Sequence, residues 1–463
     1  MKTASLAMNS PIQLDISTPL AARIAQTTTA ASLADLPTEV IDKTKLCLLD
    51  LIGCAFESRD MPWSRQAVGL IQAIEPGASV IGAPHAATYG DAAFANAVMG
   101  HGLVREDMHS GSISHLGIVV LPALLALSQY RRISGREFII AAVVGYEVGG
   151  RIGRAIMDAQ IAKIHRPTGI TGPVAAAAAG ARALGLNLEA TTSAIAIGAN
   201  TALGFNEWAH TGGSEMFFHA GFAARNAVTA ARLAEVGAFA SPTALDGGAG
   251  LFASLGKQSA AARVAMFEDQ PEILSVYHKP VPACNFAQTP CQAALRLSGD
   301  EKVDFERIAA IKIRVPRAGA LYPGCDHRGP FAHILQAKMS IQYNVAAALM
   351  LGNVSEKNFT LLKDPSLHRL ISMMELIVDN EMTRAYPALQ GGEVQITEID
   401  GTTHRKRLDN VVNATAVEVR DRFRISANAV VGAKRAAEIE QLVDSLEHSD
   451  DAGKLAELLR AEG

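Results

Sequence analysis

The stretch PVAAAAAGARALG, residues Pro173–Gly185, consists almost entirely of small apolar side chains, with one charge at Arg182. Small side chains let helix backbones approach closely, so this segment predicts a helix inside a tightly packed all-α body. Other segments share the helical pattern, and several are apolar nearly all round, which indicates burial. They are 40–52 (after the predicted N-cap Thr38), Pro122–Tyr130, Glu137–Ile156, Gly172–Leu184, Glu189–Gly198 and His219–Val236.

The pattern changes near residue 265, where strands are predicted. Arg307–Val315 alternates polar and apolar residues, and Pro316 ends the run. Glu393–Ile399 alternates in the same way before the turn signal Asp400-Gly401 and a second short run. Between these strands, Ala337–Leu351 has a helical pattern.

These segments predict a mainly α fold with two domains. The tail returns to helix, because Ile439, Leu442, Val443 and Leu446 fall at i, i+3, i+4 and i+7. We therefore expect a large, discontinuous all-helical domain, residues 1–265 and 406–463, and a smaller α+β domain, residues 266–405. The spacing leaves a second arrangement open, in which the small unit is a separate domain with the tail packed on it.

Composition excludes several classes of protein. Of 463 residues, 49% are hydrophobic. The 42 Lys and Arg residues against 46 Asp and Glu residues give a net charge of −4, and the charges are scattered along the chain. A nucleic-acid-binding protein would need an excess of basic residues, which this composition lacks. Met1–Leu14 contains no apolar signal core, and the longest apolar stretch, Leu116–Leu127, is too short to span a bilayer. The five cysteines lack CxxC spacing, and neither GxGxxG nor GxxxxGK[ST] occurs. We expect a cytoplasmic protein with no membrane or nucleic-acid partner.

The first of three polar clusters interrupts an apolar region at Asn96–Gly117. It contains three histidines and two carboxylates, which would suit a metal site. The histidines, however, are separated by eight and six residues across a Gly/Ser-rich loop, and a solvated loop with helix caps gives the same composition. We therefore favour no metal site. The residues are His101, Glu106, Asp107, His109 and His115.

The other two clusters are Lys163–Gly172 and Tyr277–Cys291. In the first, Thr168 and Gly169 precede an uncharged helix, whose free backbone N–H groups would suit a carboxylate; an ordinary helix cap explains the pattern equally well. In the second, Lys279 stands before two prolines and a cysteine at the change of composition, where a cleft would form. A proline-stiffened linker with a solvated lysine is the alternative.

Eight segments in the same order resemble the MmgE/PrpD family, which includes 2-methylcitrate dehydratases, cis-aconitate decarboxylase and iminodisuccinate epimerase. The resemblance implies a large helical domain, a smaller α+β domain, an active site between them, a homodimer and no obligatory cofactor. His115, His165, Lys279 and Tyr343 match active-site positions of the family. The segments are LLDLIGCA (Leu48–Ala55), HGLVREDMH (His101–His109), HLGIVVLPALLAL (His115–Leu127), GYEVGGRIG (Gly145–Gly153), HRPTGITG (His165–Gly172), HAGFAARNAVTAARLA (His219–Ala234), KPVPAC (Lys279–Cys284) and KMSIQYNVAAAL (Lys338–Leu349).

The chain departs from the family pattern at several polar positions. Val104 and Met108 stand where H-x-L-D-F-D-D-T has its first Asp and its Thr, and Met216 stands at the position of a family lysine. Cys284 and Gln288 occupy the candidate positions of a second histidine. Expelling a hydroxyl group needs a positioned acid, so these losses indicate that leaving-group assistance is gone while proton abstraction is kept.

A reaction that only removes and returns a carbon-bound proton is epimerisation. We therefore expect a cofactor-independent epimerase or racemase of an amino-dicarboxylate such as iminodisuccinate. Lys279 and Tyr343 would serve one face of the carbon, with His115 or His165 on the other. A dehydratase, a decarboxylase and a dicarboxylate-binding relic without turnover are the alternatives. Predicted substrate-binding residues are Arg105, Asp107, Thr168, Gly169, Tyr146, Met108, Met216 and Cys284.

Overall fold

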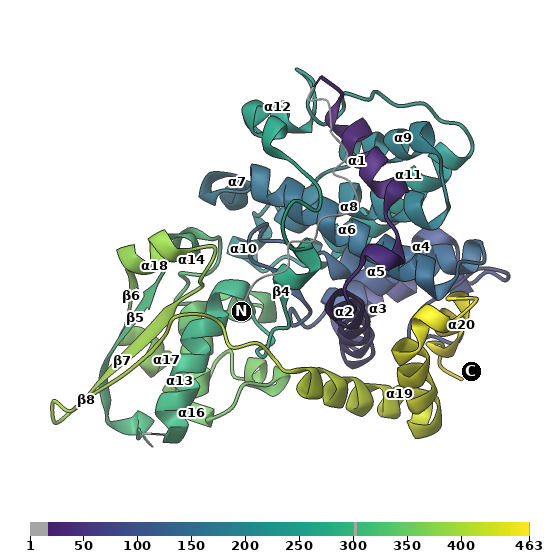
Figure 1. Cartoon of the computed structure of the whole chain (residues 1–463). Helices are drawn as coiled ribbons and strands as arrows, with labels where there is room; N and C mark the ends of the chain where they lie inside the picture. Colours follow the sequence, from purple (N-terminus) through teal and green to yellow (C-terminus); the bar gives the residue numbers. More distant parts are fainter. Residues whose placement is uncertain (1–16, 301–302, 463) are drawn as a thin grey trace.

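The computed structural model describes residues 17–300 and 303–462, so the prediction for Met1–Leu14 lies outside the described residues. A body of packed helices forms the larger part, and a smaller α+β part lies beside it (Figure 1). This arrangement confirms the predicted mainly α fold. The helices of the body are α1 (Leu20–Ala30), α2 (Thr38–Ser58), α3 (Pro62–Leu70), α4 (Tyr89–His101), α5 (Gly117–Tyr130), α6 (Gly135–Ile156), α7 (Ala159–Ile164), α8 (Pro167–Ala183), α9 (Leu188–Asn200), α10 (Trp208–Thr211), α11 (Glu215–Glu235) and α12 (Leu251–Ser254).

Helix α8 lies at the centre of the helical body and contacts α5, α6, α9 and α11. Its small residues permit this packing: a Cβ atom added to Gly149 of α6 would lie 2.9 Å from the Cβ of Ala175. Helices α5 and α8 begin earlier than predicted, and Pro122 and Pro173 lie inside them. A proline removes one backbone hydrogen bond, and the burial of both helices outweighs that loss.

The α+β part contains one four-stranded sheet in the order β6-β5-β7-β8, with β5 parallel to β6 and the other pairs antiparallel. The bounds of β5 and β7 agree within one residue with the two strands predicted from the sequence. Strand β6 was not predicted, because its sequence MELIV does not alternate between polar and apolar residues. Helix α13 contacts β5, β7 and β8. The elements are β5 (Ile308–Val315), β6 (Met374–Val378), β7 (Gly392–Glu398), β8 (Thr403–Leu408), α13 (Gln288–Asp300), α14 (Arg317–Leu321), α15 (Ile334–Met339), α16 (Ile341–Leu351), α17 (Pro365–Ser372) and α18 (Asn380–Ala385).

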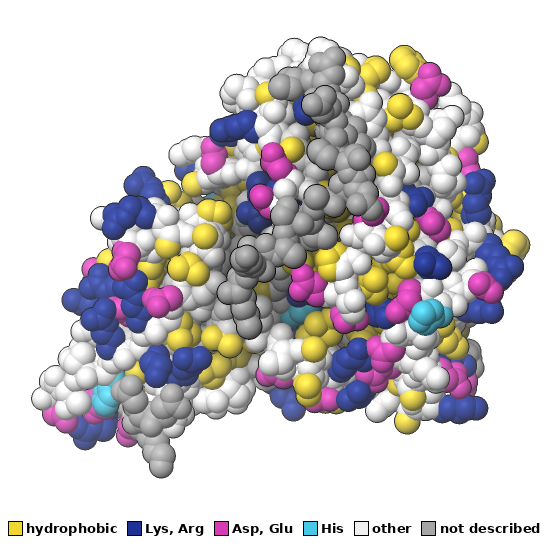
Figure 2. Space-filling model, in the orientation of Figure 1, with side chains coloured by type: hydrophobic (Ala, Val, Ile, Leu, Met, Phe, Trp, Pro, Cys, Tyr) yellow, Lys and Arg dark blue, Asp and Glu magenta, His cyan; other side chains and the backbone are white. Residues whose placement is uncertain are grey.

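The outer surface of this part carries many charges. Figure 2 shows Lys and Arg side chains gathered over it, with Asp and Glu among them. On β8, Arg405 pairs with Glu393 and Arg407 with Glu381. These two positive charges of β8 are therefore paired with carboxylates.

The tail leaves the sheet and returns to the helical body. Helix α19 (Ala416–Asp444) packs against α2, and α20 (Gly453–Leu458) packs against α5 (Figure 1). Gly432, with φ of +80°, interrupts the helical geometry of α19. The expected boundary at residue 405 falls inside β8, which pairs with β7 as far as Leu408. The division into domains stays a prediction.

Two short strand pairs complete the fold. Strand β1 (Ala78–Ser79) pairs with β2 (Ala86–Ala87), and β3 (Met108–His109) pairs with β4 (Val276–Tyr277). The second pair ties the loop after α4 to the segment that leads into the α+β part. Among the described residues, no helix combines the length and apolar character that crossing a membrane requires.

Candidate functional site

A small cavity of about 20 Å³ lies where the helical body meets the α+β part. The body contributes the loop after α4, the start of α8 and the helices α10 and α11. The α+β part contributes the segment before α13, the residue that follows α14 and the last residue of α15. The lining residues are Val104, Met108, Ile113, His115, Arg166, Trp208, Met216, Cys284, Asn285, Phe286, Tyr322 and Met339.

The loop after α4 has an unusual backbone. Val104 and Ile113 have φ of 57° and 54°, values that β-branched residues rarely adopt. Both side chains are buried and line the cavity. Such strained conformations persist only where surrounding contacts fix them, and they concentrate at functional sites.

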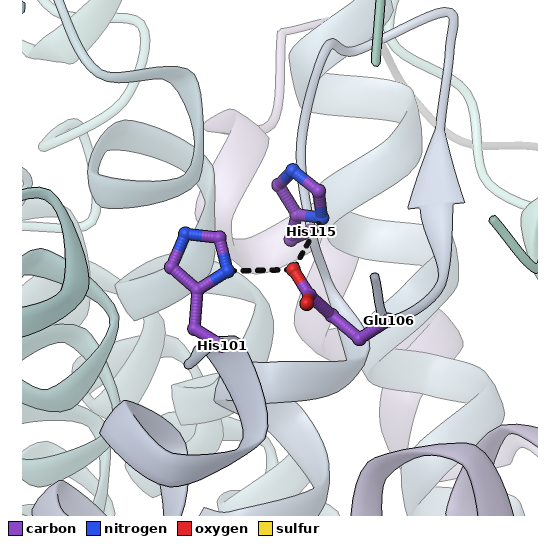
Figure 3. Close-up of side chains that lie close together, drawn as sticks. All are labelled: His101, Glu106 and His115. Atoms are coloured by element: carbon purple, nitrogen blue, oxygen red, sulfur yellow. Dashed lines mark hydrogen bonds and ion pairs between the residues drawn. The ribbon is translucent and has the colours of Figure 1, made fainter. Parts of the chain in front are cut away.

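Three buried side chains, one from the last residue of α4 and two from the loop after it, form a hydrogen-bonded triad (Figure 3). The Nδ1 atoms of His101 and His115 lie 2.6 and 2.8 Å from the same Glu106 oxygen, Oε1. Although burial opposes ionisation, the two imidazoles hold the pKa of Glu106 well below its usual range. Glu106 is therefore a carboxylate that accepts from both rings.

The partners of the triad fix the proton positions on the imidazoles. Nη2 of Arg166 lies 2.9 Å from Nε2 of His101, and an arginine can only donate, so the His101 proton is on Nδ1. Nδ1 of His115 lies 3.1 Å from the backbone oxygen of Asp107 and also faces Glu106, so it donates as well. Burial and the charge of Lys279 lower the pKa of His115 to about 3. His115 is thus neutral, with the lone pair on Nε2.

Arg166, the residue before α8, is the cation of the cavity wall. Its side chain is buried, and its Nε is a buried donor without a partner. The guanidinium lies 5.8 Å from the ring centroid of Trp208. A buried guanidinium with a free donor suits a carboxylate, which accepts two parallel hydrogen bonds from it.

Lys279 and Cys284 belong to the segment that enters the α+β part. Lys279 is fully buried, and its Nζ donates to the backbone oxygen of Ala283 at 3.2 Å. Burial lowers the pKa of Lys279, although Glu106 opposes the shift. Lys279 is not among the residues that line the cavity, whereas the neighbouring Cys284 is, with its Sγ 3.5 Å from Sγ of Cys325.

Three residues predicted from the sequence to act in the site point elsewhere. Tyr343 donates its hydroxyl to the backbone oxygen of Asn358 at 2.7 Å and packs between aromatic rings of the α+β part. The ring of His165 lies against Phe205, and His165 does not line the cavity, whereas the next residue in the chain, Arg166, does. Arg105 turns toward α2, where its Nη1 lies 3.1 Å from Oε1 of Glu57.

Four further predicted residues support the site from behind the cavity wall. Tyr146 donates to Oδ2 of the buried Asp107, and burial raises the pKa of that carboxyl. Oγ1 of Thr168 accepts from the backbone N–H of His115 at 3.1 Å. Gly169 permits close packing, because a Cβ there would lie 2.0 Å from the backbone oxygen of Leu203.

The cavity contains four of the predicted residues and several that sequence reasoning missed. His115, Met108, Met216 and Cys284 line it, and Val104, noted for its departure from the family, does so as well. Sequence reasoning did not select Arg166, although it lies in the quoted HRPTGITG segment. Met339 likewise lies in a quoted segment, KMSIQYNVAAAL, and Ile113, Asn285 and Phe286 lie inside the polar clusters. Nothing in the local pattern identified the remaining two, Trp208 and Tyr322.

Ligand atoms of the triad lie within 4.8 Å of one another, a spacing that could hold a metal ion. Each contact to Glu106 is a short hydrogen bond, and the positive charges of Lys279 and Arg166 act on the same imidazoles. Added positive charge disfavours a cation at this position. We interpret the arrangement as a hydrogen-bonded triad.

Comparisons with known proteins identify relatives over most of the chain. Residues 22–263 match the MmgE/PrpD N-terminal domain, and residues 281–448 match the MmgE/PrpD C-terminal domain. A cis-aconitate decarboxylase from Aspergillus terreus is 28% identical over 93% of this chain and 94% of its own length. The cis-aconitate decarboxylase of Mus musculus is 27% identical over 80% of this chain and 78% of its own length. That of Homo sapiens is 24% identical over 92% and 91%.

Proposed function

The chain belongs to the MmgE/PrpD family, and from this premise we propose that it is a lyase that removes carbon dioxide from a polycarboxylate. The relatives named above are decarboxylases of cis-aconitate, a tricarboxylate, which makes an unsaturated tricarboxylate the first substrate to test. This proposal replaces the epimerase as the main hypothesis, because the relatives named above are cis-aconitate decarboxylases.

The chemical character of the cavity carries the proposal. Its described wall contains one neutral imidazole, one guanidinium, the thiol of Cys284, the side-chain amide of Asn285 and the hydroxyl of Tyr322, but no carboxylic acid. The other lining side chains are apolar. A dehydratase needs an acid to protonate the departing hydroxyl. Decarboxylation needs no such acid, and an apolar wall disfavours a charged carboxylate more than neutral carbon dioxide.

Two of these polar groups then have a role. The guanidinium of Arg166 holds a carboxylate that the product retains. The carboxyl group that leaves lies against the apolar wall, where burial raises its pKa and favours its protonated form. Nε2 of His115 accepts that proton, the C–C bond breaks, and its electron pair stays on the substrate carbon. A second group returns a proton to this carbon.

The epimerase predicted from the sequence is the second candidate. The composition of the cavity wall favours it as well. The neutral imidazole of His115 has a free lone pair that could take a proton from carbon, and epimerisation expels no hydroxyl. Both candidates differ from a binding relic, which would hold a dicarboxylate without exchanging any of its protons.

One experiment separates these functions. The protein is incubated with cis-aconitate, and separately with the stereoisomers of iminodisuccinate, in D₂O, and products are followed by NMR. Release of carbon dioxide with deuterium on the product carbon supports the proposal. Inversion with deuterium exchange and no carbon dioxide establishes the epimerase instead, addition or loss of water establishes a dehydratase, and binding without any exchange overturns both catalytic functions.

A further inference from the structure

Cys284 is the thiol of the cavity wall, and its position is fixed from several sides. Its backbone N–H donates to the backbone oxygen of Lys338 at 2.9 Å, and Cys284 directly precedes the helical run that continues into α13. Cys325 faces it with an Sγ–Sγ distance of 3.5 Å. The backbone oxygen of Cys325 accepts from Ile341 at 2.9 Å, so both thiols are held by the same part of the fold.

The charges around Cys284 set it apart from the other four cysteines. Although burial opposes ionisation, the hydrogen bond from Cys325, the backbone N–H of Phe286 and the charges of Lys279 and Arg166 lower the pKa of its thiol. Burial raises the pKa of every other cysteine of the chain. The titratable groups that face Cys284 are Lys279, Arg166, Cys325, Tyr277, Tyr322 and Tyr386.

We propose that the thiol of Cys284 is the proton donor that replaces carbon dioxide on the substrate carbon, with Cys325 as its positioning residue. The inference rests on the proposed decarboxylation and names the second group that this reaction needs. The proton of the leaving carboxyl passes to Nε2 of His115, and carbon dioxide departs. The electron pair left on carbon takes the proton of the Cys284 S–H, and the resulting thiolate regains a proton from the imidazolium through solvent. No net proton is consumed and no oxidant is needed.

The other neutral hydrogen-bond donor of the wall with an acidic proton, the hydroxyl of Tyr322, is poorer. Burial raises the pKa of Tyr322 to about 12, so its hydroxyl holds its proton more tightly than a thiol does. Proton donation is most effective when the pKa of the donor lies near the operating pH, which favours Cys284.

A titration of thiolate ultraviolet absorbance tests the inference without any substrate. We expect the thiolate of Cys284 to form at a lower pH than that of an ordinary cysteine, and before those of the other four cysteines. Cys284→Ser should abolish this step, while Cys291→Ser, which changes a buried thiol of α13 outside the cavity, should keep it. Cys325→Ala removes the hydrogen bond to the thiolate and should move the step to higher pH. An unchanged step in Cys284→Ser overturns the inference.

Turnover provides the second readout. Cys284→Ala and Cys284→Ser should each lower the rate of carbon dioxide release by about 10²–10⁴-fold, the usual value of a positioned acid. Cys291→Ser should keep the wild-type rate. Because the donor must be protonated, the rate of carbon dioxide release should fall as the pH rises through the pKa of Cys284. Cys325→Ala should move this fall to higher pH.

The two proposals fail in different ways. If the wild-type chain releases no carbon dioxide from any polycarboxylate, the proposed function is overturned. If the wild type releases carbon dioxide and a folded Cys284→Ala variant does so at the same rate, only the role of Cys284 is overturned. Melting temperatures of all variants establish that each comparison is made between folded proteins.

Discussion

Replacing Arg166 by lysine tests the site most directly. The structure places this guanidinium in the cavity wall, while Arg105, selected from the sequence, faces Glu57 on α2. Arg166→Lys keeps the positive charge but removes the planar fork that binds a carboxylate through two hydrogen bonds. Arg105→Lys makes the same chemical change outside the cavity and is the matched control.

The magnitude follows from the hydrogen bonds that are lost. A hydrogen bond to a charged group contributes about 1.5–3 kcal/mol. Losing one between Arg166 and a substrate carboxylate should therefore weaken binding by about 1.5–3 kcal/mol, or about 12- to 150-fold. The retained carboxylate is not the bond that breaks, so KM should rise while kcat changes little.

Two assays measure this effect. Steady-state kinetics with cis-aconitate give KM and kcat separately, and the shift in melting temperature with a series of di- and tricarboxylates reports binding even where turnover is absent. Arg105→Lys should retain both the wild-type KM and the wild-type thermal shift. If Arg166→Lys binds carboxylates as tightly as the wild type while Arg105→Lys does not, our assignment of the carboxylate site is wrong.

Three further predictions concern stability and proton transfer. In the folded protein the pKa of His115 is about 3, against an ordinary 6.5. The stability that neutral His115 allows is therefore present above pH 6.5 and is lost as the pH falls toward 3, by up to about 5 kcal/mol. His115→Gln should make the free energy of urea unfolding less dependent on pH in this acid range, and it should lower turnover by about 10²-fold or more. Lys338→Met removes a buried ammonium that donates to the backbone oxygen of Leu103 at 3.0 Å and to the carboxylate of Glu356. The free energy of urea unfolding should therefore fall by about 3–5 kcal/mol. A loss below about 1 kcal/mol would contradict this interpretation. Gly169→Ala should lower the melting temperature, because the added Cβ would meet a backbone oxygen. Gly69→Ala should raise it, because this helical glycine has open space around it and alanine stabilises a helix by about 0.5–1 kcal/mol relative to glycine. Equal shifts in both variants would refute the packing argument.

The periodic parts of the fold were predictable because periodicity is a local property. The alternating run at Arg307–Val315 became β5, and the apolar runs became the buried helices α5, α6 and α8. Strand β6 was missed, since an irregular edge strand is recognised only beside β5. The starts of α5 and α8 were missed because proline argues locally against a helix, and burial reverses that preference only in the packed protein.

The sequence by itself determined the family and the mainly α architecture, and it predicted a set of positions where polar groups of the family are replaced. Only the tertiary structure decided which side chains share the cavity. His165 and Arg166 are neighbours in the chain, yet only Arg166 faces the site, and Tyr343 is turned into the core of the α+β part. The direction of a side chain is set by contacts with segments far away in sequence, and no local pattern of residues contains that information.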